Sequence, residues 1–110
     1  MKEIYQILYQ LGVTANYRGF YYCADAVWLA LEDTRRLSLV TKQLYPEVAK
    51  KNDTAPHCVE RDIRTVCKLG WKRNRELLMK LANGTLTQEP TVSQFVAILT
   101  QHCAQRRDMT

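Results

Sequence analysis

The stretch YPEVAKKNDTAPHCVERDIRTVCKLGW, residues Tyr45–Trp71, has the spacing of two helices joined by a short turn. Pro46 fits the first turn of the first helix, where its missing N–H would have no helical partner. Asp53 falls in the turn, because Asp tolerates a left-handed backbone. The small Ala49 allows the two helices to cross closely. This layout is typical of a helix-turn-helix, which we place at about residues 46–73.

The longer of the two helices has one apolar side and one positively charged side. On a helical wheel its apolar residues fall within about a third of the circumference; they are Val59, Ile63, Val66, Cys67 and Gly70. The opposite side carries His57, Arg61, Arg64 and Lys68, with Glu60 at its edge. Thr54 or Ala55 begins the helix, and Thr54 is the better N-cap because its hydroxyl can accept from a free backbone N–H.

A helix in the major groove of DNA needs this division, because its inner side packs on the domain and its outer side reaches the bases. Arg can donate two hydrogen bonds to guanine, and Glu can accept one from cytosine. We therefore predict that Glu60, Arg61 and Arg64 read bases. Contacts with phosphates or groove walls are predicted for the surrounding polar and cationic residues, which are Lys50, Lys51, Thr54, His57, Lys68, Lys72 and Arg73.

Two other interpretations remain open. A charged helix face is often only solvated, and Glu60 and Arg64 have the i,i+4 spacing of a surface ion pair, worth about 0.2–0.5 kcal/mol. Glu60 and Asp62 would also repel phosphates. The alternative function is a protein-interaction module of the same fold without specific DNA reading. An enzyme is poorly supported, because no nucleophile, base or carboxylate pair has a useful spacing.

Apolar spacings of three and four recur along the whole chain, so the predicted fold is all-α, a compact bundle of about six helices. Besides the helix-turn-helix, helices are expected at about residues 2–11, 20–33, 35–39, 75–83 and 92–105. Thr91 or Ser93 should cap the last helix. The tail from residue 105 should be frayed, and we expect Trp28 and Trp71 to be core residues.

The composition suits one small domain. With 110 residues, 46% of them hydrophobic, the chain can bury a single core, so we expect one domain over residues 1–110 and no receiver domain within it. The net charge of +5 favours an anionic partner. No apolar run approaches the roughly 20 residues that cross a bilayer, and no membrane partner is expected.

The four cysteines and two histidines do not have the spacing of a zinc site. No CxxC motif occurs, and we predict neither a metal nor a cofactor. Cysteines that are reduced and mostly structural indicate the cytoplasm. Cys58 is the one that we expect to be exposed.

Four stretches together carry a resemblance to a known family; they are LGVTANYRGFYYCADAVWLALED, TKQLYPEVAKKNDT, VERDIRTV and PTVSQFVAIL. They resemble the C-terminal effector domain of the stage-zero sporulation response regulator. The resemblance runs from about Ile7 to Gln105. TKQLYPEVAKK followed by VERDIR is its most specific part.

The resemblance implies a helical bundle that binds short double-stranded promoter boxes in a bacterial cytoplasm, associated with the nucleoid. It also implies tandem binding by two copies, and contact with RNA polymerase and its sigma factor. By position, the family's groove-reading residues correspond to Glu60, Arg61 and Arg64. His57 and Cys58 stand where the family usually has Ser and Arg, so one basic contact is missing, and Asp62 replaces Ala.

Overall fold

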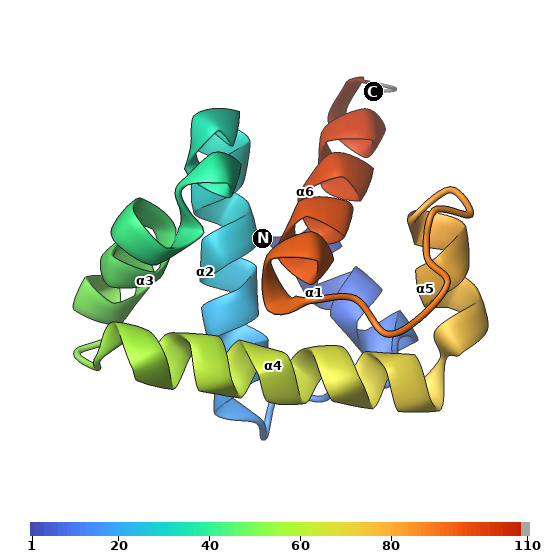
Figure 1. Ribbon diagram of the computed structural model, residues 1–110, viewed down its shortest axis with the longest axis horizontal. Coiled ribbons are helices and arrows are strands. Elements are labelled where there is room, and N and C mark those ends of the chain that lie inside the picture. The colour runs from blue at the N-terminus through green and yellow to red at the C-terminus, as the bar shows by residue number, and fades with distance from the viewer. Residues whose placement is uncertain (109–110) are drawn as a thin grey trace.

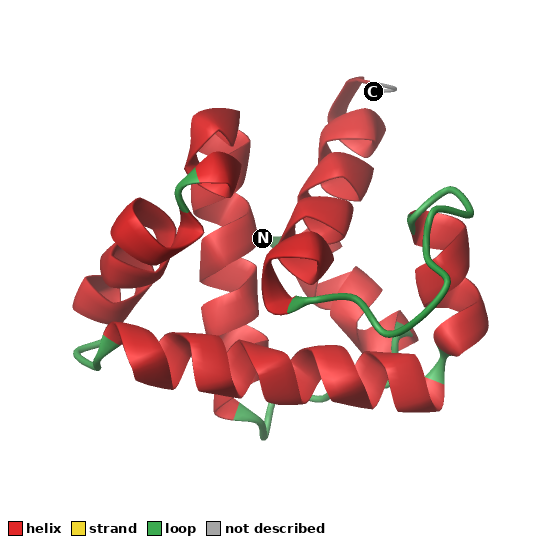
Figure 2. Ribbon diagram, viewed as in Figure 1, coloured by secondary structure: helices red, strands yellow, loops and turns green. Residues whose placement is uncertain are grey.

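The computed structural model describes residues 1–108, and every regular element in that range is a helix (Figure 2). The elements, in chain order, are α1 (Lys2–Gln10), α2 (Arg18–Glu32), the 3-10 helix η1 (Thr34–Ser38), the π-helical turn η2 (Val40–Leu44), α3 (Tyr45–Lys51), α4 (Pro56–Arg73), α5 (Arg75–Leu81) and α6 (Val92–Asp108). The predicted all-α bundle of about six helices is confirmed.

The long helix α4 forms the base of the molecule (Figure 1). α2 and α6 pack against each other and stand on α4, while α1 packs against both of them. α3 lies at the end of the molecule where α4 begins, and α5 lies at the end where α4 finishes (Figure 1). One side of α4 is therefore covered by other helices, and the other is left at the surface.

The core follows the apolar spacing of the sequence. All five residues predicted for the inner side of α4 are buried, and so are the four expected in the first helix, Ile4, Ile7, Leu8 and Leu11. The tryptophans differ from expectation, because Trp28 and Trp71 are only partly buried. Arg107 lies over the ring of Trp28 and Arg75 over that of Trp71, at 5.1 and 4.4 Å from the ring centroids. Each indole thus carries a cation on its outer face.

The first turn of α2 lies directly on the middle of α4. A Cβ atom added at Gly19 would stand 2.1 Å from the carbonyl oxygen of Asp62 and 2.7 Å from the Cγ2 atom of Val66. Only a residue without a side chain permits this approach. The contact fixes how α4 sits on the bundle, and with it which side chains face outward.

The start of α6 agrees with the sequence, but its end does not. Gln94 N donates to Thr91 Oγ1 at 3.2 Å, and Thr91 N donates back to Gln94 Oε1 at 2.9 Å, which forms a capping box. The predicted cap at Thr91 is confirmed. The helix continues to Asp108, three residues beyond its predicted end at 105. Cys103 is the last buried residue of α6 within the range whose burial is described. Residues 109 and 110 lie outside the described range.

All four cysteines are free, as expected. Cys23, Cys67 and Cys103 are buried, and burial raises the pKa of Cys67 to about 12. Cys67 Sγ donates to the carbonyl oxygen of Pro90 at 3.4 Å. Cys58 is half-buried rather than exposed, and its sulfur lies 3.6 Å from His57 Nε2.

Candidate nucleic-acid interface

The turn between α3 and α4 has the backbone that the sequence predicts. Asp53 adopts a positive φ of 53°, a conformation that Asp tolerates better than most residues. The N–H of Thr54 then donates to the carbonyl oxygen of Ala49 at 2.9 Å and closes the end of α3. α3 and α4 pack against each other, and Ala49 and Ile63 are buried in the shared core. This arrangement is consistent with a helix-turn-helix.

The start of α4 falls on the second of the two N-cap positions that the sequence predicts, Thr54 or Ala55. Ala55 is the N-cap residue, with an extended backbone, and no side chain caps the helix. The preference for Thr54 over Ala55 is therefore wrong. The reason is Pro56, which occupies the first helical position and forces the residue before it out of the helical conformation.

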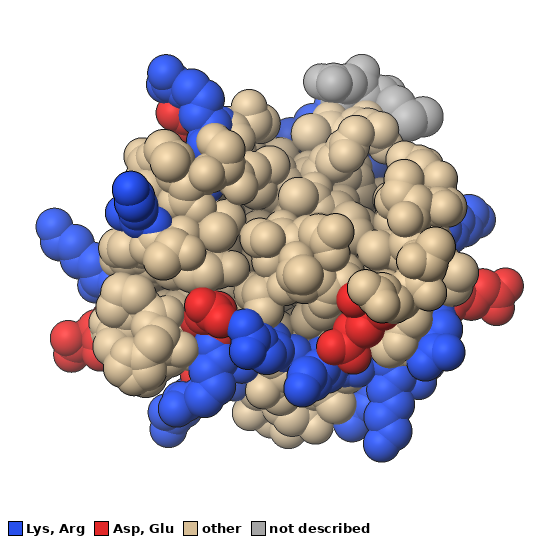
Figure 3. Space-filling model, viewed as in Figure 1, with Lys and Arg blue, Asp and Glu red and all other residues tan. Residues whose placement is uncertain are grey.

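The outer side of α4 carries the charged residues in the order that the wheel predicts. Arg61 and Arg64 have side chains that are 63% and 54% exposed, and His57 and Lys68 are exposed as well. In Figure 3, lysine and arginine atoms gather along the lower edge of the molecule, over the course of α4. The helix thus presents a cationic ridge to solvent, and we use that name for the exposed side of α4 around Arg61, Arg64 and Lys68.

Both arginines of the ridge pair with acids on their own helix. Arg64 Nη2 donates to Glu60 Oε1, the i,i+4 pair that the sequence allowed. Arg61 Nε donates to Asp62 Oδ1 at 3.3 Å, and this hydrogen bond, followed by the charge of Asp62, raises the pKa of Arg61. The second oxygen of Asp62 is buried and accepts no hydrogen bond from the described residues. The sequence did not predict the Arg61–Asp62 pair.

A shallow hollow of about 190 Å³ adjoins the Glu60–Arg64 pair. Tyr45 lines it, and burial raises the pKa of this phenol to about 12, with Glu60 adding to the effect. Thr41 and Ser93 line the same hollow. Sequence reasoning missed these two residues, because η2 and the start of α6 are brought beside α4 only by the fold.

The lysines of the predicted interface fall into two groups. Lys50, Lys68 and Lys72 are exposed and form no ion pair within the described part of the chain. Lys51 differs, because its Nζ lies 3.3 Å from Oδ1 of the buried Asp25. Asn52 Nδ2 donates to the other oxygen of that carboxylate at 2.9 Å. The α3–α4 turn is therefore tied to α2.

Arg73 has a structural partner that the sequence did not indicate. Its Nη1 donates to the carbonyl oxygen of Gly12 at 2.7 Å, and its Nη2 donates to Tyr17 Oη at 3.4 Å. Gly12 has a φ of 89°, and a Cβ added there would lie 2.9 Å from the Cβ of Arg73. The guanidinium thus fastens the α1–α2 loop to the end of α4.

The comparison with known families agrees with the geometry. A family described as sporulation initiation factor Spo0A C terminal matches residues 4–103. Its members are DNA-binding effector domains of sporulation regulators and not enzymes. None of the helices between residues 1 and 108 is both long and apolar enough to span a membrane. The match covers nearly all of the 110 residues, so this chain belongs to the Spo0A C-terminal family.

Proposed function

We propose that α4 lies in the major groove of double-stranded DNA and reads a short promoter box with Glu60, Arg61 and Arg64. One observation supports this most strongly: the inner side of α4 is fully buried, while both arginines are more than half exposed on its outer side. Bidentate contacts from such arginines to guanine distinguish it from the other bases. Glu60, beside Arg61, is suited to accept from cytosine.

The ion pairs of the free protein are weak enough to give way. Exposed pairs on one helix contribute about 0.2–1 kcal/mol, whereas a good bidentate base contact is worth about 1–3 kcal/mol of discrimination. On binding, Arg61 and Arg64 exchange their carboxylate partners for base acceptors. The released Glu60 is then available to a cytosine amino group.

Phosphate contacts supply affinity without sequence information. We propose this role for exposed or half-exposed residues around the ridge, which are Lys50, Thr54, His57, Lys68 and Lys72. Lys51 and Arg73 belong to the predicted set, but both have internal partners. We propose that they reach phosphates only through their remaining N–H groups. Their main role is to stabilise the fold.

The chain would act in the bacterial cytoplasm at the nucleoid, as a transcription regulator. We propose that two copies bind tandem boxes and that the bound protein contacts RNA polymerase and its sigma factor. These partners rest on membership of the family. In this proposal, the α4 helix of one copy contacts one box.

Selection of bound duplexes from a random pool tests this function directly. We expect a short G·C-containing box to be enriched over successive rounds at near-physiological salt. Enrichment should be lost with Arg61→Ala and kept with Lys2→Ala, a cation outside the proposed interface. A pool that shows no preferred sequence would contradict base reading.

A second candidate is an interaction module that has lost specific reading. The observation that favours it is the pairing of both arginines with acids, since Asp62 and Glu60 offset the charge of the ridge. This candidate predicts that duplex binding follows ionic strength alone. Equal affinity for the selected box and a shuffled duplex would favour it.

A further inference from the structure

A second hollow lies on a part of the molecule that the proposed DNA contacts do not use. It has a volume of about 270 Å³ and is formed by α1, α5 and α6, with no residue of α4 in its lining. Pockets for drug-sized ligands have volumes of roughly 300–1,000 Å³. This hollow therefore suits a small metabolite.

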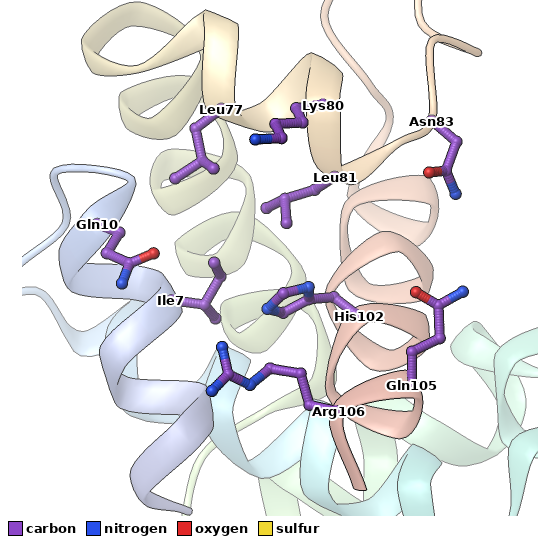
Figure 4. A pocket seen from close by; sticks show the side chains of 9 residues that line it. All are labelled: Ile7, Gln10, Leu77, Lys80, Leu81, Asn83, His102, Gln105 and Arg106. Carbon is purple, nitrogen blue, oxygen red and sulfur yellow. The ribbon is translucent and has the colours of Figure 1, made fainter. Parts of the chain in front are cut away.

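One side of the hollow is apolar. Ile7 from α1 is buried, and Leu77 and Leu81 from α5 are half-buried. Figure 4 shows these three side chains bordering the same space, from two helices far apart in the sequence. A short hydrocarbon chain could cover them and remove apolar surface from water.

The other side of the hollow is cationic. Lys80 approaches from α5, and the ring of His102 and the guanidinium of Arg106 extend from α6 (Figure 4). No carboxylate lines the hollow, and none of the three forms an ion pair with any side chain described between residues 1 and 107. Among the side chains described, no acid offsets the positive charge here, unlike that of the ridge.

The titration of His102 agrees with this excess of positive charge. Burial lowers the pKa of the imidazole, and the neighbouring Arg106 lowers it further. A bound anion would act in the opposite direction, because an opposite charge nearby favours the protonated ring. The pKa of His102 should therefore rise when an anion binds in the hollow.

We propose that this hollow binds a small carboxylate with a short apolar chain. The chain lies on Ile7, Leu77 and Leu81, and the carboxylate accepts hydrogen bonds from Arg106 and Lys80. The planar fork of Arg106 matches a carboxylate in two parallel hydrogen bonds. The proposal does not depend on DNA binding, because no residue proposed to contact DNA lines the hollow.

The test is an NMR titration of the isotopically labelled chain, without DNA, with four probes: hexanoate, 1-hexanol, hexylammonium and inorganic phosphate. Hexanoate should give saturable shifts at Ile7, Leu77 and Leu81, and should raise the pKa of His102. Hexanol lacks the charge and phosphate lacks the chain, so each should bind about tenfold more weakly. Hexylammonium should not bind.

A matched pair of variants separates a built site from general positive charge. Arg106→Gln should weaken hexanoate binding about tenfold, since it removes a charge-assisted contact. Arg107→Gln removes the same charge from the next residue of α6, where the guanidinium lies over Trp28. It should leave hexanoate binding unchanged.

Three results would overturn the proposal. The first is hexanoate binding that does not saturate, and the second is an equal loss of affinity in both variants. The third is an acidic peptide that shifts the lining residues when hexanoate does not, which would make the hollow a protein docking site. None of these results bears on base reading by α4, so the two proposals fail separately.

Discussion

The arginines of α4, two near its middle and one at its C-terminal end, differ in where their partners lie. Arg61 and Arg64 pair with acids one and four residues away on the same helix. Arg73 instead donates to the carbonyl oxygen of Gly12, 61 residues away in the sequence. Arg61 and Arg64 remain at the surface and can exchange their local partners for other acceptors. Arg73 is part of the fold, because its partner lies in a distant segment. Of the three, Arg61 and Arg64 are therefore the arginines that we propose for DNA binding.

The largest effect should come from disrupting the close contact between α2 and α4 at Gly19. Gly19→Ala puts a methyl group 2.1 Å from the carbonyl oxygen of Asp62, and backbone cannot move away as a flexible side chain can. We expect the free energy of unfolding to fall by about 3 kcal/mol. Urea unfolding followed by circular dichroism measures this loss. A wild-type midpoint for the variant would show that α2 does not fix α4.

The next effect is a difference in stability between variants of Arg73 and Arg61. Arg73→Ala removes the donor to Gly12 and should lower the free energy of unfolding by about 1 kcal/mol. Arg61→Ala should leave it unchanged, because the side chain is mostly exposed and its partners, Asp62 and Cys58, lie close by on the same helix. Thermal unfolding of the two variants side by side gives the comparison. Equal losses in both would contradict the division of roles.

Much of this fold could be predicted from local patterns, and the misses have physical causes. The five buried residues of α4 follow from helical spacing alone, and the left-handed Asp53 follows from residue preference. Of the two predicted N-cap positions, the preferred Thr54 was wrong and Ala55 was right, because Pro56 decides where α4 begins. The predicted end of α6 was three residues short, because residues 105–107 are exposed and carry no apolar spacing that would mark a helix.

The candidate site was predictable only in part, for a related reason. The wheel placed Arg61 and Arg64 on the outer side of α4, where the structure has them. It could not separate Lys51 and Arg73 from the freely exposed cations, because Asp25 and Gly12 lie far away in the sequence. Thr41 and Ser93 were missed in the same way, since only the fold brings them to α4.

The two adjacent lysines at the end of α3 extend the comparison to phosphate contacts. Lys50→Gln should reduce the slope of log affinity against log salt by about 1, as expected for one phosphate contact. Lys51→Gln should change the slope less and reduce stability more, because it leaves the buried Asp25 with Asn52 as its only described partner. Binding isotherms at several salt concentrations, together with urea unfolding, check both. Identical slopes for the two variants would argue against this difference.

The smallest effect concerns the acid beside Arg61. Asp62→Ala removes both the partner of Arg61 and a negative charge near the proposed phosphate path. We expect affinity for any duplex to rise about threefold, within the range of an exposed ion pair. Fluorescence anisotropy with a selected and a shuffled duplex measures it. A fall in affinity would mean that Asp62 holds Arg61 in its binding orientation.

The central claim is that the exposed Arg61 and Arg64 read bases and that Arg73, at the end of α4, does not. The most direct test is the ratio of Kd for a shuffled duplex to Kd for the selected box, measured for the wild type, Arg61→Ala and Arg73→Ala. We predict that Arg61→Ala lowers this ratio about tenfold or more, while Arg73→Ala keeps the wild-type ratio. A ratio that survives Arg61→Ala, or one that falls equally in both variants, would contradict the claim.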